Sequence, residues 1–117
     1  MIKLKLLVIR TADMQKLVDF YALLGFGFDY HKHGNSPYHY SAIIDGTVIE
    51  IYPLTKTQTE ADKNLRLGFE LDDFDRKIHL LKEANVSFAS ESAQTDFGFM
   101  AVVVVDPDGR KVELYKK

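Results

Sequence analysis

The chain has 117 residues, of which 46% are hydrophobic and 27% are charged, and it carries a formal net charge of −2. A chain of this size and composition forms one globular domain rather than a disordered segment, and the near-neutral charge argues against nucleic acid and membranes as partners. There is no cysteine, which excludes disulfides, thiolate nucleophiles and zinc–thiolate sites.

The first predicted element is a strand over Leu4–Ile9, a β-rich and nearly continuous apolar run. Lys3 and Lys5 interrupt the apolar residues at this end of the chain. The run is too short for a signal peptide or a membrane span, so we expect a cytoplasmic protein.

A helix follows, capped by Thr11 or Asp13 and ended by Gly25, because apolar residues between them recur at helical spacing. A Gly-Asn-Ser-Pro turn and an Asp-Gly hairpin then separate three strands. These strands are predicted over Phe26–His31, Tyr38–Ile44 and Thr47–Tyr52.

A polar stretch over Pro53–Lys63 is predicted to link two modules, one over about residues 1–53 and one over about 64–117, within a single domain of 1–117. After it the same order of elements recurs. The predicted elements are a strand over Leu65–Leu71, a helix over Phe74–Ala84, and strands over Val86–Ala89, Phe97–Val105 and Lys111–Tyr115.

The two halves also match residue by residue. A shift of about 60 residues pairs Asp13 with Asp73, and a slightly larger shift pairs residues 45–52 with 108–115, including Glu50 with Glu113. Hairpins in general need a turn glycine, but that need does not explain the matching Glu and Tyr. We therefore expect a duplicated α+β fold: two tandem βαβββ modules forming a curved, cup-like mixed sheet, with helices on its outer face.

Strand alternation places a set of polar and aromatic side chains on the concave face of that sheet. The alternative is that this face is simply exposed to solvent. The predicted set comprises Arg10, Glu50, Tyr52, Arg66, Glu70, Glu113 and Tyr115.

Two segments resemble a known family. The opening Val8-Ile9-Arg10-Thr11-Ala12-Asp13, with Phe20-Tyr21 and Leu24-Gly25-Phe26 after it, and the closing run from Asp106 to Tyr115 are similar to the vicinal-oxygen-chelate superfamily. That superfamily includes glyoxalase I, extradiol dioxygenases, and fosfomycin-resistance and bleomycin-resistance proteins. The resemblance spans essentially the whole chain and implies the duplicated fold, a small-molecule site in the cup and a homodimer.

The resemblance also implies four metal-ligand positions, and only two of them carry ligand atoms here. Glu50 and Glu113 stand at the second and fourth positions, whereas Leu6 and Arg66 stand at the first and third. Arg66 is a cation and cannot bind a metal ion, so we expect no cofactor. Arg66 is instead predicted to replace the metal electrostatically, by bridging both glutamates or by holding one of them and a ligand anion. The alternative is that it points to water.

Three histidines, His31, His33 and His39, lie close together in sequence and suggest a metal site. No carboxylate stands near them in sequence, so a polar strand end at the rim of the cup is favoured, with His39 as a ligand contact. Arg10 is expected to contact either Glu70 or a ligand carboxylate. Six phenylalanines are predicted to be core residues: Phe26, Phe28, Phe69, Phe88, Phe97 and Phe99.

These observations favour a metal-independent protein that binds a small organic molecule with an apolar body and a polar or anionic group. One alternative is a glyoxalase-like lyase or isomerase, or a dioxygenase-type metalloenzyme, in which Glu50 or Glu113 is catalytic and moves a proton. Another is a degenerate cup kept for dimerisation.

Overall fold

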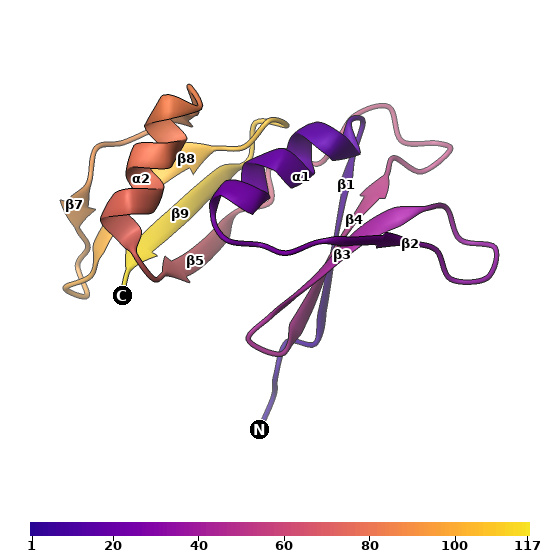
Figure 1. The fold of residues 1–117 in the computed structure, drawn as a ribbon, viewed down its shortest axis with the longest axis horizontal. Coiled ribbons are helices and arrows are strands. Elements are labelled where there is room, and N and C mark those ends of the chain that lie inside the picture. The colour runs from indigo at the N-terminus through magenta and orange to yellow at the C-terminus, as the bar shows by residue number, and fades with distance from the viewer. The chain divides into compact units, whose positions relative to one another are not determined.

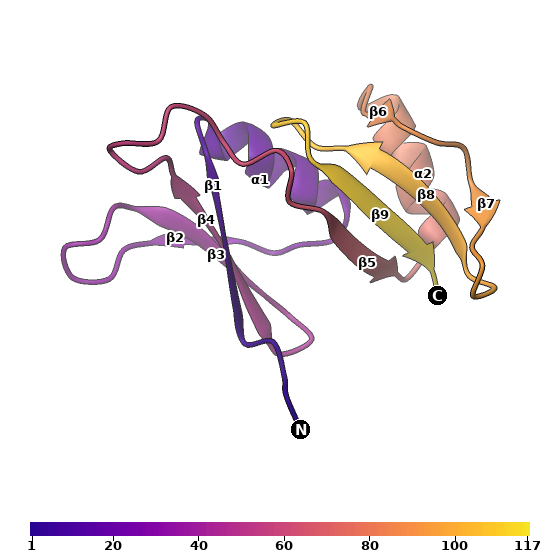
Figure 2. The same ribbon diagram turned by 180° about the vertical axis from the view of Figure 1, so that it is seen from behind.

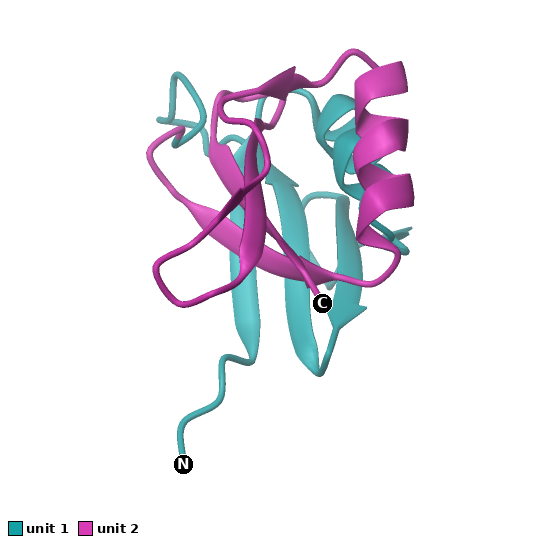
Figure 3. Ribbon diagram, turned by 90° about the vertical axis from the view of Figure 1, so that its left-hand side faces the viewer, with its two compact units in different colours: residues 1–62 teal, residues 63–117 magenta.

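The computed structural model describes residues 1–117, and they form two compact units, Met1–Asp62 and Lys63–Lys117 (Figure 3). We call them the first unit and the second unit. The division between Asp62 and Lys63 lies in the polar stretch that was predicted to be a linker.

The first unit contains one helix and a four-stranded mixed sheet (Figure 1). The strand order is β1-β4-β3-β2, in which β1 runs parallel to β4 and the other neighbours are antiparallel. The elements are β1 (Leu6–Thr11), α1 (Met14–Leu23), β2 (Asp29–His31), β3 (His39–Ile44) and β4 (Thr47–Pro53).

Helix α1 covers one face of this sheet and contacts β3 and β4. Its first turn is capped by Asp13, whose carboxylate accepts a hydrogen bond of 3.1 Å from the Lys16 amide. The apolar stripe of the helix is buried against Ile49 and Ile51 of β4. Because strand residues alternate between faces, Glu50 and Tyr52 lie on the face opposite α1.

The second unit repeats this plan with one additional short strand (Figure 2). Its strand order is β5-β9-β8-β6, with β5 parallel to β9 and with β7 paired to β8 outside that path. The elements are β5 (Leu67–Leu71), α2 (Phe74–Glu83), β6 (Ser87–Phe88), β7 (Ala93–Gln94), β8 (Met100–Val105) and β9 (Lys111–Lys116).

Helix α2 lies along one face of the β8–β9 sheet in both views (Figures 1 and 2). Its Phe74, Ile78 and Leu81 are buried, as are alternate residues of β8 and β9 such as Val104 and Leu114. Neither helix of the protein has the length and apolar composition needed to cross a membrane. The predicted α+β class and the tandem βαβββ order are confirmed, and each module has its own mixed sheet.

The closing motif folds into a turn built around a buried ion pair. The Arg110 Nη1 donates to Asp106 Oδ2 at 3.2 Å and to Asp108 Oδ2 at 2.8 Å, and both Arg110 and Asp106 are buried. Burial alone would lower the pKa of Arg110, but hydrogen bonds to Asp108 and Asp106 and their negative charges outweigh it and raise that pKa. The motif therefore fixes the β8–β9 hairpin.

Several predicted strands differ from the structure at their ends. The largest error is the predicted strand Phe97–Val105, of which only Met100–Val105 is β8. Gly98 adopts a φ of 86° in a tight turn between β7 and β8, in which the Thr95 amide donates to the Phe99 carbonyl at 2.7 Å. Phe97 and Phe99 are consequently 88% and 51% exposed, so their assignment to the core was wrong.

The other boundaries shift by a few residues. The first strand begins and ends two residues later than predicted, and the second begins only at Asp29. The strand predicted over Leu65–Leu71 begins at Leu67, and the one predicted over Val86–Ala89 contains only Ser87–Phe88. None of these shifts changes which face of a strand its side chains occupy.

Candidate functional site

The eight predicted site residues separate into two groups, one in each unit. The first unit holds Arg10, His39, Glu50 and Tyr52, and the second unit holds Arg66, Glu70, Glu113 and Tyr115. Apart from Arg66, which comes just before β5, the residues of each group lie on the sheet face that its helix does not cover.

Strand pairing positions the group in the first unit. His39 lies opposite His31 in the β2–β3 pair, and Ser41 lies opposite Glu50 in the β3–β4 pair. Since His39 and Ser41 are two residues apart on β3, they share a face, and His39 therefore lies beside Glu50.

The His39 ring is fully buried and is fixed on several sides. Its Nδ1 lies 3.1 Å from the Pro37 carbonyl oxygen, and its ring stacks on Tyr52 with centroids 4.1 Å apart and planes at 11°. Its Nε2 lies 3.1 Å from Glu50 Oε2, within ion-pair distance, yet the two atoms lack the alignment of a hydrogen bond. A short distance alone does not make a hydrogen bond, which also requires a donor aligned with its acceptor.

Arg10 completes this group from β1. Its guanidinium carbon lies 5.0 Å from the centre of the Tyr52 ring, and its Nη1 donates to the Pro53 carbonyl at 3.0 Å. Within the first unit the arginine therefore contacts the aromatic ring that stacks on His39.

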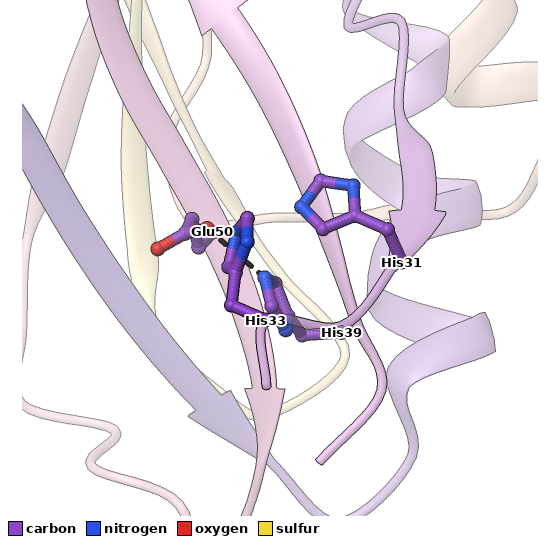
Figure 4. A group of neighbouring side chains, drawn as sticks. All are labelled: His31, His33, His39 and Glu50. Atoms are coloured by element: carbon purple, nitrogen blue, oxygen red, sulfur yellow. Dashed lines mark ion pairs between the residues drawn. The ribbon is translucent and has the colours of Figure 1, made fainter. Parts of the chain in front are cut away.

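His31 and His33 surround His39, with ring centroids 4.7 Å and 5.1 Å from it (Figure 4). The four residues His31, His33, His39 and Glu50, which we call the histidine cluster, place one ligand atom each within 4.8 Å of all the others. The sequence alone argued against a metal site here, because no carboxylate stands close to the histidines along the chain. The β3–β4 hairpin brings Glu50 to the histidines. Pairing residues outward from its Asp45-Gly46 turn places Glu50 opposite Ser41, next to His39, and this pairing could have been made from the sequence.

The group in the second unit is held by a different set of contacts. Arg66 Nη2 lies 2.6 Å from Glu113 Oε1, and the Tyr115 hydroxyl donates to Glu113 Oε2. This hydrogen bond, with burial and the negative charge of Glu113 adding to it, raises the pKa of Tyr115, and the positive charge of Arg66 partly opposes the increase. The alternative in which Arg66 contacts neither glutamate is wrong, and the bridge to Glu50 stays a prediction.

Beside these residues lies a cavity of about 480 Å³, which we call the aromatic pocket. Tyr115 is the strand partner of Glu70, and Gly68 is the partner of Glu113. A Cβ on Gly68 would lie 3.2 Å from the Tyr115 ring, so the glycine makes room for that ring. The lining comprises Glu70, Thr95, Asp96, Phe97, Phe99, Glu113 and Tyr115.

Four of those lining residues come from the turn between β7 and β8. This turn was not predicted from the sequence. Phe97 and Phe99 were assigned to the core, and the ring of Phe99 instead meets Tyr115 edge-on at 6.3 Å. The available signal was Gly98, because a glycine inside a predicted strand often marks a bulge or a turn.

The metal-ligand set implied by the family resemblance does not fit these residues. Leu6 offers no ligand atom and is 52% exposed, and Arg66 donates to Glu113, which would otherwise be a ligand. Glu50 has its close neighbour, His39, within its own unit. We therefore derive no chemistry from a metal ion at those four positions.

Comparison with known proteins gives a family model and several similar folds. The model of the Glyoxalase/Bleomycin resistance protein/Dioxygenase superfamily matches residues 3–114. No curated protein matches the chain.

Three solved structures illustrate the similarity of fold. A protein of the same superfamily from Sphaerobacter thermophilus is 19% identical with a TM-score of 0.76, covering 100% of this chain and 98% of its own. A virulence protein from Salmonella typhimurium is 17% identical with a TM-score of 0.76, covering 99% and 97%. An integron cassette protein from V. cholerae is 18% identical with a TM-score of 0.74, covering 99% and 95%.

Proposed function

Because the chain belongs to the Glyoxalase/Bleomycin resistance protein/Dioxygenase superfamily, we propose that it binds a small organic molecule in the aromatic pocket of the second unit, without a metal ion at that site. The observation that carries the proposal is a cavity of about 480 Å³ with three aromatic rings at its wall. Cavities that bind small molecules typically have volumes of about 300 to 1,000 Å³ and mostly apolar walls.

The exposure of Phe97 and Phe99 supports this proposal. Large aromatic side chains are normally buried, and an exposed pair beside a cavity is typical of a binding surface. Their backbone is held by the turn at Gly98, where the Phe99 amide donates to Thr95 Oγ1 at 3.1 Å. The two rings are thus presented by a closed turn, which reduces the entropy lost on binding.

The charges at the pocket favour a particular ligand chemistry. Three carboxylates line it, and only Glu113 is neutralised within the second unit, by Arg66. Neither Glu70 nor Asp96 has a salt bridge within that unit. We therefore propose a ligand with a planar apolar body and a cationic or hydrogen-bond-donating group, in place of the anionic group that the sequence allowed.

The alternative of a lyase or isomerase requires Glu50 or Glu113 to accept a proton from a substrate. Glu113 already accepts a hydrogen bond at each oxygen, from Arg66 and from Tyr115, so a substrate proton would have to share an oxygen with one of these donors. The catalytic role of the two glutamates stays a prediction, and no contact of the pocket favours it over binding.

The test uses three aromatic probes of similar size and different charge: naphthylmethylamine, naphthalenemethanol and naphthoic acid. Binding is measured by chemical-shift titration, which also identifies the contacted residues. We expect the amine to bind about tenfold more tightly than the acid, because it meets carboxylates that repel the acid. Contacts are expected at Phe97 and Phe99.

Variants separate the pocket from general surface binding. The double variant Phe97→Ala/Phe99→Ala should weaken the amine by about tenfold, since each aromatic contact contributes about 0.5 to 1.5 kcal/mol. Tyr38→Ala, which removes an exposed aromatic ring in the first unit, is the matched control and should change nothing. The proposal fails if no probe perturbs the β7–β8 turn, or if the control weakens binding as much as the double variant.

A further inference from the structure

The histidine cluster of the first unit combines residues from three successive strands and from the turn between the first two. His31 lies on β2, His33 follows it in the β2–β3 turn, and His39 and Glu50 lie on β3 and β4. Their ligand atoms all lie within 4.8 Å of one another (Figure 4). None of the four lines the aromatic pocket, and only Glu50 stands at a position that the family resemblance implies for metal.

The protonation of His39 follows from its Nδ1 contact. The Pro37 carbonyl oxygen can only accept a hydrogen bond, so Nδ1 at 3.1 Å carries the proton. In a neutral imidazole the other nitrogen, Nε2, then presents a lone pair. A backbone carbonyl that fixes the far nitrogen in this way is the usual second partner of a metal-binding histidine.

The geometry between His39 and Glu50 then needs a positive charge. Nε2 is buried and has no hydrogen-bond partner, and Glu50 Oε2 lies 3.1 Å from it with its side chain only 13% exposed. A lone pair and a carboxylate at this distance repel each other unless a proton or a metal ion lies between them, and the missing hydrogen-bond alignment disfavours the proton. In a tetrahedral zinc site, neighbouring ligand atoms are about 3.3 Å apart and face the ion rather than each other. The observed distance and misalignment match that arrangement.

The surrounding structure holds the ligands in place. The Tyr52 ring stacks on His39, and the β2–β3 pairing sets His31 opposite His39. His33 is held by a closed turn, in which its amide donates to Ser36 Oγ at 2.9 Å and its carbonyl accepts from the Ser36 amide at 2.8 Å. The imidazole of His33 is exposed and already lies beside the rings of His31 and His39, with centroids 4.8 Å and 5.1 Å away.

We infer that the first unit binds one divalent first-row transition-metal ion, of the Zn²⁺ class, through His31, His33, His39 and Glu50. Three imidazoles and one carboxylate suit zinc, cobalt, nickel or copper, whereas calcium and magnesium prefer oxygen ligands throughout. The four ligand atoms lie within 4.8 Å of one another. On binding, the His31 and His33 side chains rotate so that their ring nitrogens approach the ion. The site is separate from the aromatic pocket, so each can be present without the other.

The test titrates Zn²⁺ into the full chain after chelator treatment, using calorimetry for the affinity and stoichiometry. One ion per chain is expected, with Zn²⁺-dependent shifts in the imidazole resonances of His31, His33 and His39. Co²⁺ should give the visible absorption of a tetrahedral site. Substoichiometric binding, or shifts confined to His79, overturns the inference.

Variants identify the ligands without disturbing the buried ring. His33→Ala, at an exposed position, and Glu50→Gln, which keeps the side-chain shape, should each weaken Zn²⁺ binding by at least about tenfold. His79→Ala is the matched control, because His79 is an exposed histidine on α2 that pairs only with Glu83. Amide spectra verify that each variant is folded. Equal affinity in His33→Ala and the wild type, or equal loss in His79→Ala, contradicts the assignment.

Discussion

Each unit has a glutamate at the equivalent position of its equivalent strand, but the two glutamates have different partners. In the first unit Glu50 lies beside the buried imidazole of His39, and in the second Glu113 accepts from Arg66 and Tyr115. The repeated Tyr differs as well: Tyr52 stacks on His39, whereas Tyr115 donates its hydroxyl to the glutamate.

Duplication has therefore kept the strand position, while the neighbouring segments determine the chemistry. The β2–β3 segment supplies three histidines in the first unit, and the β7–β8 turn supplies two phenylalanines in the second. Gly68 adds to the difference. Its counterpart under the 60-residue shift is Val8, and a valine side chain at position 68 would occupy the space used by the Tyr115 ring. A histidine-rich cluster and an aromatic pocket have thus arisen on equivalent sheets.

The largest expected effect is a loss of stability on substitution in the hairpin turns that come just before Glu50 and Glu113. Arg110 pairs with Asp106 and Asp108 in a buried turn, whereas its counterpart Thr47 makes one exposed hydrogen bond to the Leu4 carbonyl. Arg110→Ala should cost roughly 3 to 5 kcal/mol of unfolding free energy, because it leaves two carboxylates without their cation. Urea denaturation measures this loss.

Thr47→Ala is the matched substitution in the first unit and should cost less than about 1 kcal/mol. Arg110→Lys retains the charge but not the guanidinium geometry, so its stability should fall between the wild type and Arg110→Ala. Similar losses in Thr47→Ala and Arg110→Ala would show that the two hairpins contribute equally, contrary to the buried geometry.

The repeat made much of the fold predictable from the sequence. The matching runs from Asp45 to Tyr52 and from Asp108 to Tyr115 set strand register, and alternation then placed Glu50 and Glu113 on the face opposite the buried Ile51 and Leu114. The helices were predictable for a similar reason, because their apolar stripes recur at helical spacing and become buried.

The partners of the site residues were harder to predict, because they depend on pairing between strands. Glu50 is distant from the histidines in sequence, and only the β3–β4 register brings it to His39. Phe97 and Phe99 alternate as core residues of a strand would, but the turn at Gly98 takes them out of the sheet. Hydrophobic pattern alone does not distinguish a buried aromatic residue from one that lines a pocket.

A smaller effect is expected when Arg66 is replaced by its counterpart in the first unit, Leu6. The Arg66 side chain is 56% exposed, so Arg66→Leu should cost only about 0.5 kcal/mol at low salt and nothing measurable at high salt. Freeing Glu113 should strengthen binding of naphthylmethylamine by about twofold. If denaturation and the ligand titration are both unchanged at low salt, the Arg66–Glu113 pair has no role in either.

The smallest expected effect is a change in the titration of Tyr115. Its hydrogen bond to Glu113 raises its pKa above the usual value of about 10, so the bond's contribution to stability is fully present below that pH and is lost as the pH rises through the folded-state pKa. Carbon-13 labelling of tyrosine rings measures the midpoint. Glu113→Gln should lower it, and Arg66→Leu should raise it further because the opposing positive charge is removed. An unchanged midpoint in Glu113→Gln would mean that the hydroxyl does not sense the carboxylate, and the contrast between Tyr115 and the stacked Tyr52 would then rest on packing alone.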